Sequence, residues 1–200
     1  MDRICFVGKL ANALSPGKSE ELEKALATLV PESLPVDVAY EIVLQSYLFF
    51  GYAQAIESAK IFFGNLTKRG LKIPHSPDIA FDSASLRKRG EELCRSIYAP
   101  NFERLVANMA EVSPELSHWM VEEGYGKVLS RPGPTGLERE VASIVFLAIS
   151  GHPVQLFSHV RGARNLGATR EFLVSVVEEA GLKKPQKELI QGTIDKVFTF

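Results

Sequence analysis

The feature that most constrains the fold is the apolar segment of residues 137–167, LEREVASIVFLAISGHPVQLFSHVRGARNLG. At 3.6 residues per turn, its first half forms one apolar stripe of Leu137, Val141, Ile144, Val145 and Ala148, and Phe146, Leu147 and Ile149 cover the other sides. A helix that is apolar all round is normally buried. Pro153 ends it, because proline has no amide hydrogen and disfavours helix at His152, yet it suits the first turn of a new helix. The segment therefore predicts a buried helical hairpin.

Three polar residues within this hairpin are the candidate site. Glu140 lies at the rim of the first apolar arc, and His159 lies about two turns into the second helix. Counted outward from the turn, the two come within roughly one helical turn of each other. His152 precedes His159 by seven residues, so both share a face. It also stands at the amino end of the second helix, where free amides favour an anion or a neutral imidazole.

Most of the remaining chain also has helical spacing of its apolar residues, and no convincing strand pattern is present. Ser113 is a plausible helix cap with Pro114 at the first helical position. The predicted fold class is all-α. We expect two helices in 3–29, one helix over 36–64 interrupted at Gly51, and further helices at 85–98, 101–109, from 114 to about 124–126, 170–179 and from about 186 to 198.

The chain is predicted to contain two pseudo-repeats of helical hairpins. With Arg3 placed near Arg139 and residues 13–15 on 148–150, the two ends show the same order of buried helix and Ser-containing turn, at an offset of roughly 135 residues. We expect an N-terminal pseudo-repeat at 1–67, a crossover at 68–84 that contains KRGLKIPHSPDIAFDS, and a C-terminal repeat at 85–200, all in one compact domain. The chemistry is not duplicated, because Lys24 stands near the position equivalent to His159.

Charge and cysteine usage exclude several functional classes. The net charge of -1 gives no overall attraction for nucleic acid or an anionic membrane. No apolar run approaches the ~20 residues needed to span a bilayer, and the start of the chain has no clear signal peptide, so we expect a cytoplasmic protein. Cys5 and Cys94 form no CxxC, and we expect both to be reduced, buried thiols. The four histidines show no HExxH pattern, so no metal site is expected.

Residues 124–177, GYGKVLSRPGPTGLEREVASIVFLAISGHPVQLFSHVRGARNLGATREFLVSVV, resemble the carboxymuconolactone decarboxylase family, which shares its all-helical fold with alkylhydroperoxidase D. The shared features are the Gly-Tyr-Gly and Arg-Pro-Gly entry, the Glu-Arg pair that opens the buried helix, and the later histidine and Asn-x-Gly. IVLQSYLFFGYAQAIESA, at 42–59, resembles the third helix of the family more weakly. Together these matches cover somewhat over half of the chain.

The resemblance assigns roles to residues of the hairpin. His159 matches the histidine of the family and Glu140 its glutamate, whereas His152 and Gln155 occupy the two cysteine positions of the peroxidase branch. Attack on a hydroperoxide and recycling through a disulfide both need cysteine, so the resemblance favours the decarboxylase branch, which uses no cofactor. His159 would then be the acid/base, Glu140 would orient or charge it, and His152 would assist.

The same branch implies a small carboxylated or lactone substrate. Arg131 or Arg139 would hold the substrate carboxylate, because guanidinium binds carboxylates bidentately. The alternatives are a hydroperoxidase-like antioxidant protein and a helical oligomer that binds a small molecule without catalysis. The histidines also fit packing or capping roles, and the arginines could pair with neighbours such as Glu138. The apolar helices, with the Tyr47–Phe50 run as core or subunit interface, predict a homo-oligomer.

Overall fold

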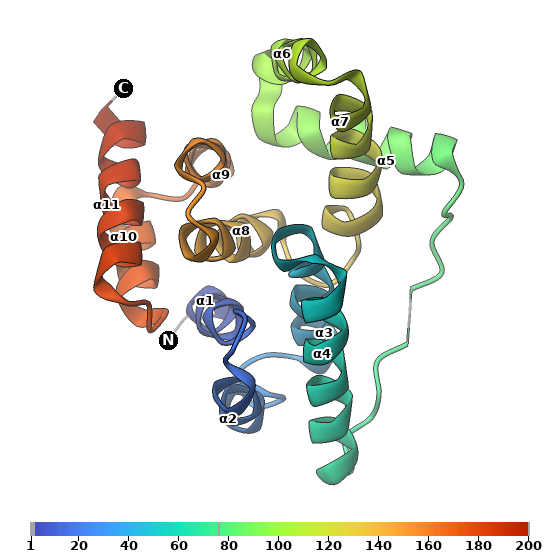
Figure 1. Cartoon of the computed structure of the whole chain (residues 1–200), viewed down its shortest axis with the longest axis vertical. Helices are drawn as coiled ribbons and strands as arrows, with labels where there is room; N and C mark the ends of the chain where they lie inside the picture. The colour runs from blue at the N-terminus through green and yellow to red at the C-terminus, as the bar shows by residue number, and fades with distance from the viewer. Residues whose placement is uncertain (1–2, 76, 200) are drawn as a thin grey trace. The chain divides into compact units, whose positions relative to one another are not determined.

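The computed structural model describes residues 3–75 and 77–199, which contain helices and no strand, and this confirms the all-α class (Figure 1). None of the helices in this part of the chain combines the length and the apolar character needed to cross a membrane. The elements are α1 (Arg3–Ala13), α2 (Ser19–Leu29), α3 (Val36–Gln45), α4 (Tyr47–Lys68), α5 (Ser83–Tyr98), the 3-10 turn η1 (Ala99–Asn101), α6 (Phe102–Val112), α7 (Pro114–Trp119), the π-helix η2 (Met120–Leu129), α8 (Gly136–Ser150), α9 (Pro153–Asn165), α10 (Arg170–Glu179) and α11 (Lys184–Thr199).

The chain divides into two compact units. The first unit comprises Met1–His75 and Gly133–Phe200, and the second comprises Ser76–Pro132. These boundaries differ from the expected ones, because the segment 85–200 that was predicted as one repeat is divided between the units. The division follows the packing: α8 packs on α1 and α9 in the first unit, whereas α5 packs on η2 in the second.

Helix α8 forms the centre of the first unit. It contacts α1, α4, α9 and α11, and Figure 1 shows it between α1 and α9. The predicted buried helix and hairpin are confirmed: Gly151 ends α8 in the left-handed conformation and Pro153 begins α9. Thr135 starts α8 with a reciprocal capping box to Glu138. The side chains that α8 buries in the core are those of Val141, Ala142, Ile144, Val145, Phe146, Leu147 and Ala148.

The predicted interruption at Gly51 is confirmed, and the structure adds a second break. Gly51 has φ 79° and ψ 175°, which a residue with a side chain rarely adopts. The expected helix over 36–64 is also divided at Ser46, so it forms α3 and α4. The buried Ser46 hydroxyl donates to the Val43 carbonyl at 2.7 Å. This bond satisfies one of the carbonyl groups in the last turn of α3. The turn 47–50 therefore lies between two breaks.

In the second unit, the predicted start of the helix at Pro114 is confirmed, but its predicted end is wrong. Ser113 caps this helix, and the chain then continues through the glycines as η2 instead of ending near 124–126. A side chain at Gly126 would overlap the Leu86 carbonyl oxygen and lie 2.7 Å from the carbonyl carbon. Gly126 therefore permits close packing of η2 on α5 and does not form a turn.

Candidate functional site

Three consecutive charged residues are buried at the start of α8. Glu138, Arg139 and Glu140 are 1%, 3% and 2% exposed. Buried charges are costly unless they are paired, so each needs a partner. Successive residues of a helix point about 100° apart, and each of these side chains therefore reaches a different neighbouring helix.

Glu140 pairs with His159 of α9. The distance between Glu140 Oε2 and His159 Nδ1 is 2.8 Å, and the histidine side chain is 13% exposed. This confirms the predicted approach of the two residues. An ionised carboxylate only accepts hydrogen bonds, so Nδ1 carries the hydrogen. Among the described residues Nε2 has no protein partner, so it is the nitrogen of this pair that can still donate or accept a hydrogen bond.

Aromatic side chains border the imidazole. The ring centroids of Phe49 and His159 are 6.3 Å apart with an edge-on angle of 68°, and Phe49 also lies 5.2 Å from Phe146 of α8. The sequence indicated a core or interface role for this run and did not place Phe49 beside the histidine. The available signal was Gly51, because a glycine two residues after Phe49 permits the turn 47–50 to end there.

His152 does not join the Glu140–His159 pair through a hydrogen bond in the described part of the chain. It is exposed at the amino end of α9, where its side chain makes no capping hydrogen bond. Its amide donates to the Leu147 carbonyl at 3.1 Å, and its own carbonyl accepts from Leu156 at 3.0 Å. Seven residues of helix correspond to roughly 10 Å of rise, which separates it from His159 along the axis.

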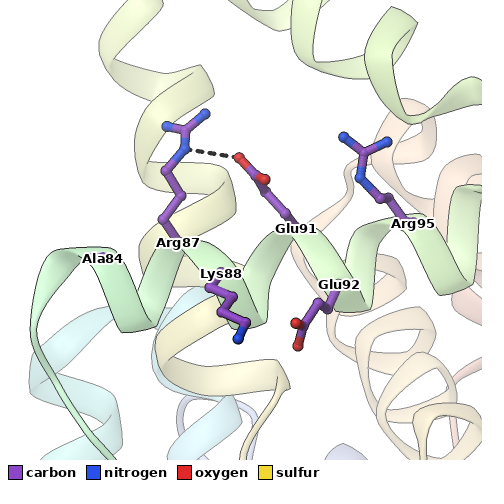
Figure 2. Close-up of a pocket in the computed structure, with 6 residues that line it drawn as sticks. All are labelled: Ala84, Arg87, Lys88, Glu91, Glu92 and Arg95. Carbon is purple, nitrogen blue, oxygen red and sulfur yellow. Dashed lines mark hydrogen bonds and ion pairs between the residues drawn. The ribbon is translucent and has the colours of Figure 1, made fainter.

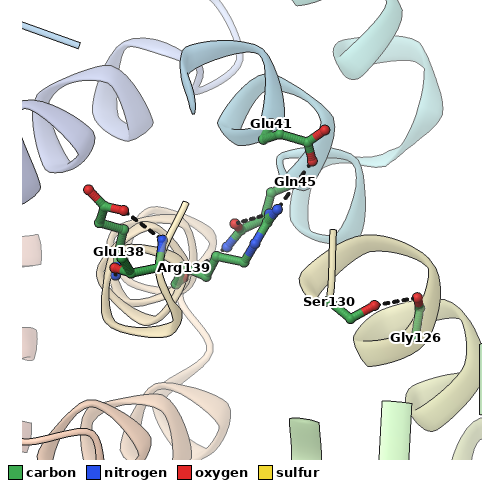
Figure 3. Close-up of polar contacts among 7 residues, drawn as sticks. Glu41, Gln45, Gly126, Ser130, Glu138 and Arg139 are labelled. Carbon is green, nitrogen blue, oxygen red and sulfur yellow. Dashed lines mark hydrogen bonds and ion pairs between the residues drawn. The ribbon is translucent and has the colours of Figure 1, made fainter. Parts of the chain in front are cut away.

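Arg139 belongs to a buried network between α8 and α3 (Figure 3). Its guanidinium donates to Glu41 Oε2 at 3.1 Å and to Gln45 Oε1 at 3.2 Å. Gln45 Nε2 donates in turn to the Arg139 carbonyl at 2.9 Å and to the Ser143 hydroxyl at 3.0 Å. The guanidinium expected to bind a substrate carboxylate is thus engaged by a carboxylate of the fold, which gives Arg139 a structural role.

Glu138 is engaged by the fold as well. Its carboxylate accepts from the Thr135 amide at 2.6 Å and forms an ion pair with Arg3 of α1, in which one hydrogen bond is 2.9 Å long. Arg131, the other arginine expected to bind substrate, belongs to the second unit, where it is buried and its amide donates to the Val128 carbonyl at 3.3 Å. The candidate site in the first unit therefore consists of Glu140, His159 and Phe49.

A hollow of about 470 Å³ lies along one face of α5, in the second unit (Figure 2). Arg87 is paired there with Glu91 at 2.9 Å, and Arg95 forms an ion pair with Glu103. Both pairs are exposed to solvent, and two of the cations are already matched by carboxylates. The residues that line the hollow are Ala84, Arg87, Lys88, Glu91, Glu92 and Arg95. This face is a solvated helix surface and a weaker candidate than the Glu140–His159 pair.

Comparison of the sequence with models of known protein families and with curated proteins finds no match. The resemblance to the carboxymuconolactone decarboxylases therefore depends on the residues quoted above and stays a prediction.

Proposed function

We propose that the chain is a cofactor-independent acid–base enzyme of the carboxymuconolactone decarboxylase type. The observation that carries this proposal is the 2.8 Å hydrogen bond between the buried Glu140 carboxylate and His159 Nδ1. A histidine whose second nitrogen is open and whose first is fixed by a carboxylate is arranged as a general acid or base. The residues quoted for the resemblance add the reaction class, which the geometry by itself does not specify.

In this proposal, His159 transfers the proton and Glu140 is a positioning residue. Cleavage of the bond to the substrate carboxylate releases carbon dioxide and leaves the bonding electron pair on carbon. Nε2–H donates a proton to that carbon, and the neutral imidazole then regains a proton from water. Glu140 fixes the ring orientation and balances the positive charge of the imidazolium before the transfer.

The test is release of carbon dioxide from a panel of carboxylated unsaturated lactones. His159→Gln should reduce kcat by about 100-fold or more, since positioned acid–base groups contribute on that scale. Glu140→Gln should have a smaller effect, because a neutral amide can still orient the ring. His118→Gln is a matched control: His118 is exposed in the second unit, and its loss should leave the rate unchanged. A folded His159→Gln enzyme with nearly full activity would refute the proposal.

A hydroperoxidase-like function is the first alternative. His152 and Gln155 stand where that branch has cysteines, and the thiols of Cys5 and Cys94 are buried in different units. Peroxide consumption that disappears in a Cys5→Ser/Cys94→Ser double variant would favour this alternative. Ligand binding at His159 without turnover of any panel member would favour the second alternative, a non-catalytic binding protein.

The proposal includes an alkylhydroperoxidase D-like bundle built from two pseudo-repeats. In support, α1 packs on α2 as α8 packs on α9, and α3 packs on α4 as α10 packs on α11. The Arg3–Glu138 ion pair joins two positions that are 135 residues apart, which is the offset of the repeat. Because the repeat places Arg3 near Arg139, the residue after Glu138, this ion pair joins nearly equivalent positions, as is expected beside a twofold axis.

The proposal also covers assembly and location. We propose a cytoplasmic homo-oligomer that buries the exposed apolar face of α4, where Tyr52 and Ile56 are 69% and 44% exposed one turn apart. A closed symmetric assembly is the usual way to cover such a face. A small-molecule substrate remains the expected partner.

A further inference from the structure

We propose that α9 carries an anion-binding site at Arg161 and Arg164, and that this site takes a doubly charged tetrahedral oxyanion, either inorganic phosphate or the phosphate group of a phosphomonoester. The site is separate from the Glu140–His159 pair. Residues two apart on a helix point about 200° apart, so Arg161 lies on the opposite flank of α9 from His159. The inference therefore does not depend on the proposed reaction.

The guanidinium of Arg161 is partly removed from water and has no partner. Its Nε is buried without a hydrogen bond, and none of its nitrogens has a hydrogen-bond or ion-pair partner among the described residues. The side chain as a whole is only partly buried, and Nη1 and Nη2 are not among the buried atoms that lack a partner. Nε therefore lies inside while the fork of Nη1 and Nη2 is open to solvent. A partly buried cation without a partner costs free energy, so this arrangement favours an anion on the open fork.

Arg164 places a second guanidinium on the same face of α9. It follows Arg161 by three residues, and residues at this spacing are neighbours on a helix surface. α9 packs on α11 (Figure 1), and Arg164 Nη1 donates to the Val197 carbonyl in the last turn of α11 at 2.7 Å. Its Cζ also lies 5.6 Å from the centroid of the Phe198 ring. These contacts hold the side chain in place without neutralising it, since neither partner is a carboxylate.

The positive charge of this pair is not balanced within the described part of the chain. α9 contains no aspartate or glutamate, and no ion pair engages Arg161 or Arg164 there. Asp195, the carboxylate of α11 closest in sequence to Val197, accepts two hydrogen bonds from Arg170. Like charges one helical turn apart repel each other, and an anion that bridges the two guanidinium groups removes this repulsion.

Two neighbouring guanidinium groups favour a tetrahedral dianion over a monocarboxylate. Guanidinium binds phosphate and carboxylate oxygens through two parallel hydrogen bonds. A phosphate group has three acceptor oxygens and a charge near −2 at neutral pH, so Arg161 can bind two oxygens and Arg164 the third. A monocarboxylate has one charge and two oxygens, and it leaves one of the two cations without a partner.

The test is titration of the full chain with phosphate, sulfate, glycerol 3-phosphate and acetate at constant ionic strength. NMR of the Arg161 Nε–H signal and of the α9 amides reports the binding. Arg161→Gln removes the fork, whereas Arg161→Lys keeps the charge and removes the fork geometry. Arg170→Gln is the matched control, because it removes the same charge from the same unit at a guanidinium that Asp195 already engages. Far-UV circular dichroism checks that each variant is folded.

We expect phosphate and sulfate to shift the Arg161 signal with similar Kd values, and acetate to bind about tenfold more weakly or worse. Arg161→Gln should raise the Kd for phosphate about tenfold or more, and Arg161→Lys should raise it by a smaller factor. Arg170→Gln and His159→Gln should leave it nearly unchanged. Tighter binding of glycerol 3-phosphate than of phosphate would identify a phosphomonoester as the ligand, and the reverse order would identify the free ion.

Several results would overturn the inference. They are the absence of a phosphate-induced shift at Arg161, equal affinities for phosphate and acetate, and a phosphate Kd that rises as much in Arg170→Gln as in Arg161→Gln. Full affinity in Arg161→Lys would refute the role of the fork even if Arg161→Gln did not fold. Lactone turnover plays no part in these measurements, so the proposed function and this site stand or fall separately.

Discussion

Replacement of Arg139 by methionine tests whether the buried network between α8 and α3 is structural. The Arg139 and Glu41 side chains are 4% and 5% exposed, so their ion pair is largely removed from water. Methionine fills a similar volume but cannot donate a hydrogen bond. The change leaves the Glu41 carboxylate buried without its arginine and leaves Gln45 Oε1 without the donor at 3.2 Å.

The expected loss can be calculated from these contacts. Both hydrogen bonds have the charged guanidinium as donor, and a hydrogen bond that involves a charged group contributes about 1.5–3 kcal/mol. Their sum agrees with the ~3–5 kcal/mol that removal of one partner of a buried ion pair usually costs. The double variant Arg139→Met/Glu41→Leu removes both charges, and its free energy of unfolding should recover to within about 1–2 kcal/mol of the unchanged protein.

Urea unfolding followed by hydrogen exchange of α3 and α8 amides measures this free energy in the first unit. Trp119 fluorescence provides a separate signal, because the single tryptophan lies in the second unit. Lys68→Met is the matched control: its ion pair with Glu23 is exposed, so the change should cost less than about 1 kcal/mol. A loss below about 1 kcal/mol in Arg139→Met, with an unchanged urea slope, would refute the reasoning. If that stable variant bound a carboxylate ligand more weakly, the result would instead support a substrate-binding role for Arg139.

Three further predictions concern the second unit and the assembly. Gly126→Ala should destabilise α5–η2 packing strongly in thermal unfolding, whereas Gly124→Ala, which meets no atom within 4 Å, should be neutral or slightly stabilising. The hydrogen bond from Ser85 lowers the pKa of Asp82 in the folded protein. The stabilisation of α5 by this cap should therefore be complete above the pKa that Asp82 has in the unfolded chain, and it should be lost as the pH falls through the lowered pKa of the folded state. Hydrogen exchange at Ser85 should show this loss, and Asp82→Asn should abolish its pH dependence. Light scattering should detect an oligomer that Tyr52→Glu dissociates, and a concentration-independent monomer would contradict the proposed assembly.

The parts of the fold that could be predicted from sequence are those fixed by local chemistry. The hairpin of α8 and α9 follows from helical spacing and from Pro153, which act within a few residues. The approach of Glu140 to His159 follows from the same hairpin, because both residues are counted outward from one turn. Short sequence separation therefore made this half of the site accessible to prediction.

The remaining features depend on partners that are distant in sequence. Arg139 looked like a substrate ligand because Glu41, its partner, precedes it by 98 residues. Gly126 resembled a helix end, but its role depends on the backbone of Leu86, 40 residues earlier. Helical spacing gives no information on such pairings, since it identifies buried faces and not the element that covers each face.

The three buried charges of α8 also link the stability of the first unit to the geometry of its candidate site. Glu138 is fixed by Arg3 of α1 and Arg139 by Glu41 of α3, so the rotation of this helix turn about its axis is set from two directions. Glu140 belongs to the same turn, and its direction toward His159 is therefore fixed as well.

A change at Arg139 should consequently weaken both folding and catalysis, because a small rotation of α8 moves the Glu140 carboxylate out of hydrogen-bond reach. Replacement of His159 by glutamine should affect catalysis far more than folding, since the glutamine amide can still donate a hydrogen bond to the buried Glu140 carboxylate but cannot transfer a proton. The two variants therefore separate the residues that position the acid–base pair from the residue that transfers the proton.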